Sequence, residues 1–224
     1  MFVSCWSVKG GAGTTVVAAS LAMVSAESSA SGSLLVDLGG DCPAVLGLPE
    51  SGGDGIADWL AAGEGVPTDG LARLEAPAGG GVGLIRRGNA PIERARLDRV
   101  DVLGGLLAVE PRPVVIDCGV IRDQGQPFDE VALVLAGAAT HSWLVTRACY
   151  LALRRAVVAP ITPSGVVLVR EPGRSLRAGD IEDILQVPVV AQVAYEASIA
   201  RAVDAGLLAG RLPRVLEQAV RRAA

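Results

Sequence analysis

The chain has 224 residues, half of them hydrophobic, with a mean hydropathy of +0.44 and a formal net charge of −4. This composition excludes a disordered chain, and the acidic balance excludes a global basic field for nucleic acid. Four dispersed cysteines and a single histidine argue against a zinc site and indicate a reducing compartment. We find no signal-peptide pattern and no apolar run that could span a bilayer, so we expect a cytoplasmic protein that does not bind membranes.

Short runs rich in Val, Leu and Ile alternate with longer segments of helical periodicity. The runs that predict strands are Phe2–Val8, Ser33–Leu38, Val82–Arg86, Pro113–Asp117, Ser142–Thr146, Gly165–Arg170 and Val187–Val193. The segments that predict helices are Thr15–Glu27, Gly55–Ala62, Ile92–Val109, Asp129–Gly137, Ala148–Val158, Ala178–Leu185 and Ser198–Leu208. Apolar strands separated by helices predict a doubly wound α/β fold, whose mainly parallel sheet is covered on both faces. We expect residues 1–224 to form one domain, because no linker or repeat interrupts the pattern.

The most informative segment joins the first predicted strand to the first predicted helix. It consists of Lys9, Gly10, Gly11, Ala12, Gly13, Thr14 and Thr15. Glycines let a backbone turn its N–H groups inward at the positive end of a helix, which makes a nest for a phosphate group. The flanking strand and helix, with a lysine ahead of Gly-Gly-x-Gly, predict a nucleotide-binding loop. The alternative is a tight strand-to-helix turn that binds no ligand.

This loop resembles the deviant Walker A motif of the ParA and MinD ATPases, which reads K-G-G-x-G-K-[ST]. Other segments resemble that family along nearly the whole chain: Leu34–Leu38, Gly83–Gly88, Val114–Gly119, Leu144–Arg147, Leu151–Ala156, Val187–Val190 and Tyr195–Ile199. The resemblance implies a P-loop fold, binding of ATP or ADP with Mg²⁺, and a homodimer. It also implies that the seven loop residues bind the nucleotide, and that Lys9 reaches the nucleotide of the second protomer.

Two acidic residues complete the site that the resemblance implies. Asp37 and Asp117 each follow an apolar strand, and sites of open parallel sheets lie at the carboxyl ends of strands. The resemblance implies that these carboxylates and the Thr15 hydroxyl lie at the Mg²⁺ ion, with Asp37 as the one candidate for a catalytic role. The alternative for both acids is a role in a turn or a helix cap.

Three departures from the family pattern concern hydrolysis and base recognition. Thr14 stands where the family has a second loop lysine, and Gly39 where it has the acid that positions the attacking water. The segment Leu168–Arg170 lacks the asparagine that often reads adenine. Because phosphoryl transfer depends on positioning and charge stabilisation, these losses predict weak or absent hydrolysis, and they leave open that no nucleotide binds. Asp41 is an alternative to the missing acid, in a shifted register.

We therefore predict a degenerate ParA/MinD-like positioning or scaffolding factor, similar to the TadZ/CpaE-type proteins of pilus and secretion systems, with a protein of such a system as partner. One alternative is an active ATPase that dimerises with ATP through Lys9, which is the only lysine among 20 basic residues. The other is a nucleotide-independent DNA-binding protein that uses Arg147, Arg154 and Arg155 on one helix, with Arg170, Arg174 and Arg177 beside them. Arginines that only solvate helix faces explain the same charges.

Four further features are predicted to be structural. Trp59 is expected to anchor a helix on the sheet, His141 to pack, and Cys118 to fill a small buried space. The segment Pro213–Ala224 has a thin apolar stripe without aromatic residues, so we expect a helix docked on the sheet and no membrane-targeting helix.

Overall fold

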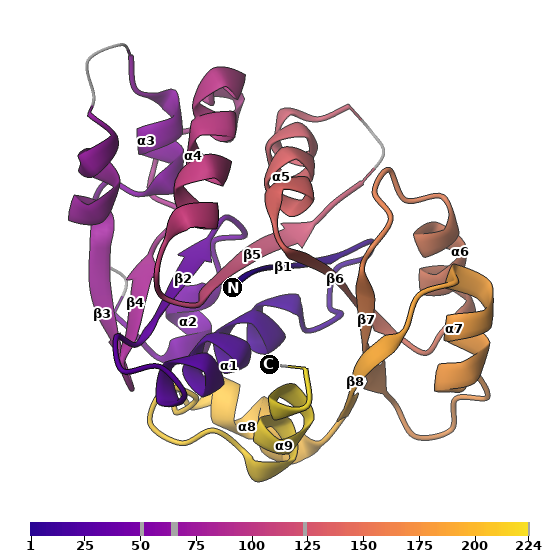
Figure 1. The fold of residues 1–224 in the computed structure, drawn as a ribbon. Helices are drawn as coiled ribbons and strands as arrows, with labels where there is room; N and C mark the ends of the chain where they lie inside the picture. Colours follow the sequence, from indigo (N-terminus) through magenta and orange to yellow (C-terminus); the bar gives the residue numbers. More distant parts are fainter. Residues whose placement is uncertain (50–51, 64–66, 123–124, 224) are drawn as a thin grey trace.

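Eight strands form one sheet in the order β3-β4-β2-β5-β1-β6-β7-β8 (Figure 1). This computed structural model describes residues 1–49, 52–63, 67–122 and 125–223. The parallel strands are β1 (Phe2–Ser7), β2 (Ser33–Asp37), β4 (Val82–Ile85), β5 (Val114–Val120), β6 (His141–Arg147), β7 (Gly165–Arg170) and β8 (Val189–Ala194). At one edge, β3 (Glu75–Gly79) runs antiparallel to β4. The predicted doubly wound, mainly parallel sheet is confirmed.

Helices cover both faces of this sheet (Figure 1). One face carries α3 (Ile56–Ala61), α4 (Leu97–Val109), α5 (Pro127–Ala138), α6 (Tyr150–Val157) and α7 (Ala178–Leu185). The other carries α1 (Thr14–Glu27), α2 (Cys42–Leu46), α8 (Ala197–Asp204) and α9 (Arg214–Arg221). Strand β1 shows why the strands are apolar throughout: Phe2 and Trp6 pack on the first face, whereas Val3 and Cys5 pack on the second.

Several predicted elements differ from those in the structure. The predicted helix Ile92–Val109 is divided into a 3₁₀ turn, η2 (Ile92–Arg94), and α4, because the backbone is extended at the two residues between them. The predicted helix Ser198–Leu208 ends at Asp204, and Gly206 then takes a left-handed φ of 62°. Three elements were not predicted: α2, which has only five residues, the 3₁₀ helix η1 (Thr68–Leu74), and β3, whose proline and glycine are atypical of strands.

The side chains predicted to be structural are mostly confirmed. Trp59 is buried in the core under α3, with the Arg99 guanidinium 3.8 Å above its ring centroid, and Cys118 is fully buried. His141 is exposed at the start of β6, with its ring centroid 6.2 Å from that of Trp143, so it contacts a neighbouring ring but is not part of the core. Helix α9 docks as predicted, with its buried side chains against α1 and β8, whereas Ala224 lies outside the described residues. Within the described chain, no helix has the length and hydropathy to cross a membrane.

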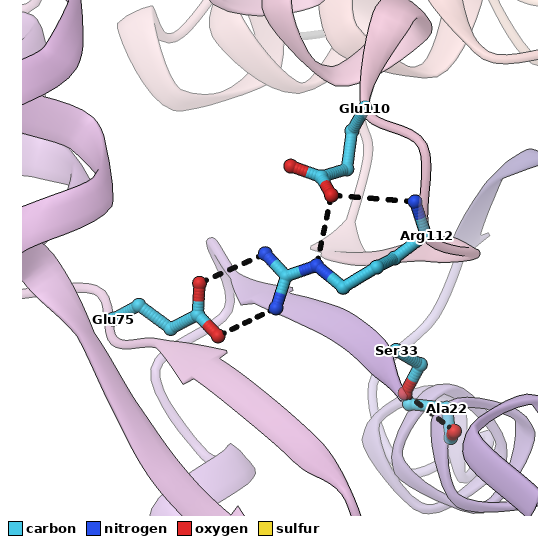
Figure 2. A network of polar contacts seen from close by, with 5 residues as sticks. All are labelled: Ala22, Ser33, Glu75, Glu110 and Arg112. Atoms are coloured by element: carbon cyan, nitrogen blue, oxygen red, sulfur yellow. Dashed lines mark hydrogen bonds and ion pairs between the residues drawn. The ribbon is translucent and has the colours of Figure 1, made fainter. Parts of the chain in front are cut away.

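Arg112, which precedes β5, ties the antiparallel edge of the sheet to the end of α4 (Figure 2). Its Nη1 and Nη2 donate hydrogen bonds to Oε1 and Oε2 of Glu75 at 2.7 and 2.9 Å. Its Nε donates to Oε1 of Glu110 at 2.8 Å, and this hydrogen bond lowers the pKa of Glu110. The three side chains are only 22–25% exposed, so solvent screens the bidentate contact with Glu75 and the single contact with Glu110 less than it screens surface pairs.

Replacing Arg112 by alanine is expected to lower the free energy of unfolding by about 1–3 kcal/mol, because two half-buried carboxylates lose their partner. Urea denaturation measures this change. The matched control is Arg73→Ala, which removes an exposed ion pair with Asp69 and is expected to cost less than about 0.5 kcal/mol. Equal losses in the two variants would contradict this account of the edge.

Candidate functional site

The glycine loop leaves β1 at the carboxyl edge of the sheet and enters α1. Gly11 and Gly13 have φ values of 75° and 89°, which glycine adopts without strain. Gly13 is the N-cap of α1, and no side chain of the described residues caps this helix. The first N–H groups of α1 are therefore available to an anion at the positive end of the helix dipole. The backbone thus has the geometry of an anion nest, and binding of a phosphate group there stays a prediction.

The side chains of the loop differ sharply in exposure. Lys9 is exposed and forms no hydrogen bond or ion pair with any described residue. Thr14 is buried and carries no charge, so the position of the second loop lysine supplies no cation. Thr15 is half-buried, and its hydroxyl lies near enough to the Asp117 carboxylate to lower the pKa of that group. The structure therefore places Thr15 beside the acidic residues, whereas Lys9 has no polar partner in the part of the chain that the structure describes.

Two cavities flank the loop. A small cavity of about 80 Å³ lies between Lys9–Ala12 and the end of β6. A larger one, of about 500 Å³, lies between the loop, the first turn of α1 and the β8–α8 turn with Tyr195 and Glu196, and apolar side chains line most of it. This volume is typical of pockets for small organic ligands. An anion nest beside an apolar cavity suits a ligand that combines phosphate groups with a flat base.

Two acidic residues lie at the same edge of the sheet, on neighbouring strands. Asp37 and Asp117 are paired in register between β2 and β5, and both are fully buried. Their carboxylate oxygens and Sγ of Cys42 lie within 4.8 Å of one another. Asp37 accepts hydrogen bonds from the backbone N–H groups of Gly40, at 2.6 Å, and Cys42, at 3.1 Å, and Asp117 accepts one from Gly119 at 2.9 Å.

Burial and mutual repulsion shape the charge of this pair. Burial, with the charge of Asp117, raises the pKa of Asp37 to about 6 despite the N–H donors, and burial also raises the pKa of Asp117. Within the described residues, no arginine or lysine forms an ion pair with either carboxylate. Their oxygens and the Thr15 hydroxyl are the hard ligands that Mg²⁺ prefers, so these residues fit that ion. Burial raises the pKa of the Cys42 thiol well above its usual value, and its Sγ donates a hydrogen bond to Oδ2 of Asp117 at 3.8 Å.

The structure also places Gly39, where the family's second acid is missing, and Asp41, the predicted alternative to that acid. A Cβ at Gly39 would lie 3.2 Å from Oδ2 of Asp117, so Asp117 itself occupies the space beside this position. Asp41 is exposed at the N-cap of α2 and lies outside the buried group of Asp37, Cys42 and Asp117. Its charge still adds to the rise of the Asp117 pKa.

The arginines predicted to share one helix do not do so. Arg147 is the last residue of β6, whereas Arg154 and Arg155 lie on α6. The extended backbone of Cys149, the N-cap of α6, separates them, so this prediction is wrong. Arg174 forms an ion pair with Glu171, at 2.7 Å between Nη2 and Oε2, in the turn before α7.

Sequence reasoning missed several residues at this edge. Cys42 belongs to a helix too short to show periodicity, although its place five residues after Asp37 is a usable signal. Tyr195 lies in a segment that resembles the family, but its place in the larger cavity depends on how β8 meets α8. Arg147 was assigned to a helix face, and the end of β6 brings it instead to the glycine loop.

Comparison with known proteins supports the fold. No family model and no curated protein matches the sequence. A ParA family ATPase from Chlorobium tepidum TLS is similar, with a TM-score of 0.77, 18% identity, and coverage of 97% of this chain and 94% of that one. The septum site-determining protein MinD of Pyrococcus horikoshii OT3, complexed with Mg-ADP, is similar with a TM-score of 0.74 and 19% identity. The match covers 99% of this chain and 93% of that one. A chain of the MinC:MinD cell division protein complex of Aquifex aeolicus is similar with a TM-score of 0.73 and 17% identity, and the match covers 100% of this chain and 94% of that one. The chain has a ParA/MinD-like fold.

The raised pKa of Asp37 predicts a stability that depends on pH. Because the folded protein holds this proton more tightly than the unfolded chain, stability falls as pH rises from about 4 through about 6. In Asp37→Asn this loss is expected to shrink by about 2 kcal/mol, measured as the difference in unfolding free energy between about pH 4 and about pH 8. The exposed Asp69→Asn serves as control and should keep the wild-type slope. A wild-type slope in Asp37→Asn would contradict the raised pKa.

Restoring the family's second acid by Gly39→Asp is expected to destabilise the ligand-free protein. The new side chain would meet Asp117 and add a third negative charge to an uncompensated pair. Gly39→Ala is the matched control, because it adds the Cβ without the charge. We expect the aspartate variant to unfold at a lower temperature than the alanine variant, and equal melting temperatures would count against the electrostatic argument.

Proposed function

We propose that this protein is a nucleotide-responsive positioning factor that binds ATP or ADP with Mg²⁺ and hydrolyses ATP slowly or not at all. The observation that carries the proposal is the combination of an intact backbone nest with Thr14 and Gly39 at the positions that hydrolysis needs. The ParA and MinD structures of the same fold support it, one of them a septum site-determining protein with bound Mg-ADP.

Different residues would bind the phosphate groups, the base and the metal ion. The N–H groups of Gly11–Thr15 would face the phosphate groups, and the apolar cavity beside Tyr195 would take the base. Thr15, Asp37 and Asp117 would hold Mg²⁺, which neutralises phosphate charge when bound. Because the two carboxylates repel each other, binding of the ion and nucleotide is expected to stabilise the fold.

The same residues explain why hydrolysis would be slow. Thr14 offers no positive charge to the transferred phosphoryl group, and Gly39 offers no carboxylate to orient the attacking water. Removing one such stabilising contact typically costs about 10²–10³ in rate. Phosphoryl transfer relies on these contacts for almost all of its catalysis, so the joint loss favours a switch or scaffold over an efficient ATPase.

Lys9 supports assembly as a nucleotide-dependent homodimer. It is exposed, it has no partner among the described residues, and it stands at the family's signature position. The same observation supports the alternative of an active ATPase in which Lys9 of one protomer serves the nucleotide of the other. A further protein would then dock on the dimer, such as a component of a pilus or secretion system, and the MinC:MinD complex shows one such pairing for this fold.

Calorimetry with ATP and ADP, with and without Mg²⁺, is expected to show binding, and phosphate release is expected to stay well below about one turnover per second. Thr14→Lys restores the missing cation and should strengthen ATP binding at least about tenfold, because charged hydrogen bonds to phosphate are strong. Thr14→Val is the matched control, since it keeps the size of threonine without adding charge. Fast turnover by the wild-type protein would refute the proposal of weak hydrolysis.

Lys9→Ala is expected to abolish ATP-dependent dimerisation while leaving ATP binding by the monomer within about threefold of wild type. Sedimentation velocity with and without ATP and Mg²⁺ measures this effect. Lys9→Arg keeps the charge and should retain part of the dimerisation. If ATP does not change the oligomeric state of the wild type, the role of Lys9 at a dimer interface is wrong.

A further inference from the structure

Arg147 places a cation directly beside the phosphate nest. It is the last residue of β6, and its Nη2 lies 3.9 Å from the position that a Cβ would take at Gly11. The same side chain lines both of the cavities that flank the loop. A ligand that occupies either cavity therefore meets this guanidinium.

Glu171 and Arg174 form a charged group with Arg147. Arg147 Nη1 donates to Oε1 of Glu171 at 2.6 Å, and Arg174 Nε donates to Oε2 at 2.7 Å. The hydrogen bond from Arg174 and the charge of Arg147 lower the pKa of Glu171, so this carboxylate is ionised at neutral pH. One carboxylate between two guanidinium groups leaves a surplus positive charge, and no other acid of the described chain pairs with Arg147.

The Arg147 guanidinium also retains unused hydrogen-bonding capacity. Its Nε is buried and has no acceptor among the described residues. The group lies over the ring of Tyr195, with Cζ 5.2 Å from the ring centroid, which restricts its orientation. The side chain is 34% exposed, so a ligand can still reach it. An arginine donates up to five hydrogen bonds in a planar fork that matches phosphate oxygens.

We infer that Arg147 is a phosphate-binding cation of this site, which contributes to nucleotide affinity from the end of β6 without occupying the place of a lysine at position 14. The inference rests on the proposed function, because its ligand is the phosphate chain of the nucleotide. Thr14 is buried and neutral, and Lys9 is exposed at the position that faces a second protomer in the proposed dimer. Without Arg147, a monomer would meet the phosphates with backbone dipoles and the metal ion alone.

Binding of ATP and of inorganic pyrophosphate, each with Mg²⁺, tests this inference by calorimetry. Arg147→Ala is expected to bind both ligands about tenfold to a hundredfold more weakly, because a charge-assisted contact is lost. A similar loss for pyrophosphate places the contact at the phosphates and not at the base beside Tyr195. Arg154→Ala is the matched control, since it removes an equal charge from an exposed position of α6 and should leave both affinities unchanged.

Glu171→Gln separates ligand binding from a structural role of the ion pair. It releases Arg147 from its carboxylate, so we expect ATP to bind at least as tightly as to the wild type. Equal weakening in Arg147→Ala and Glu171→Gln would show that the pair only supports the fold and would overturn the inference. Unchanged ATP affinity in Arg147→Ala would overturn it and leave the proposed function standing. Failure of the wild type to bind ATP at millimolar concentration would overturn both.

Discussion

Two buried carboxylates, which form no ion pair with any described arginine or lysine, determine the electrostatics of the carboxyl ends of β2 and β5. The parallel pairing of β2 with β5 fixes Asp37 and Asp117 side by side, and backbone N–H groups are their main compensation. Burying two like charges together is unfavourable, so binding of a proton or a metal ion between the two carboxylates lowers the free energy of the folded protein. The neighbouring loop, with its inward N–H groups, prefers an anion. A metal ion and a phosphate together satisfy both preferences, and neither alone does so.

The departures from the family pattern at Thr14 and Gly39 have opposite effects on the charge of the site. Relative to the family pattern, the first removes one positive charge and the second one negative charge, so the net charge of the edge is unchanged. Binding of a neutralised metal–nucleotide pair depends on that net charge, whereas phosphoryl transfer depends on individual charges at defined positions. On the proposed function, the site would therefore hold its ligand without the groups that act on it.

Much of the fold follows from local sequence, because the seven predicted strands are mainly apolar runs. Side chains of the central strands are buried on both faces of the sheet, whereas β8, at an edge, exposes Gln192. The glycine loop and the strand-end acids could also be predicted, since both carry their signal within a few residues. What could not be predicted depends on distant contacts. Cys42 joins the acids through a five-residue helix, and Arg147 reaches the loop because β6 lies beside β1. The break at Ala95 and Arg96 divides a segment whose hydrophobic periodicity runs on without interruption.

The exposure of Lys9 has a chemical consequence of its own. Every other basic side chain except His141 is a guanidinium, so Lys9 carries the only primary amine of any side chain in the sequence. An enzyme or reagent that acylates lysines would therefore change the charge of this protein at one side chain, next to the glycine loop. Acetylation there would leave the fold untouched and remove the group proposed to contact a second protomer. Because the sequence has a single lysine, any side-chain acylation of lysine would occur at the glycine loop, beside the proposed nucleotide and dimer contacts.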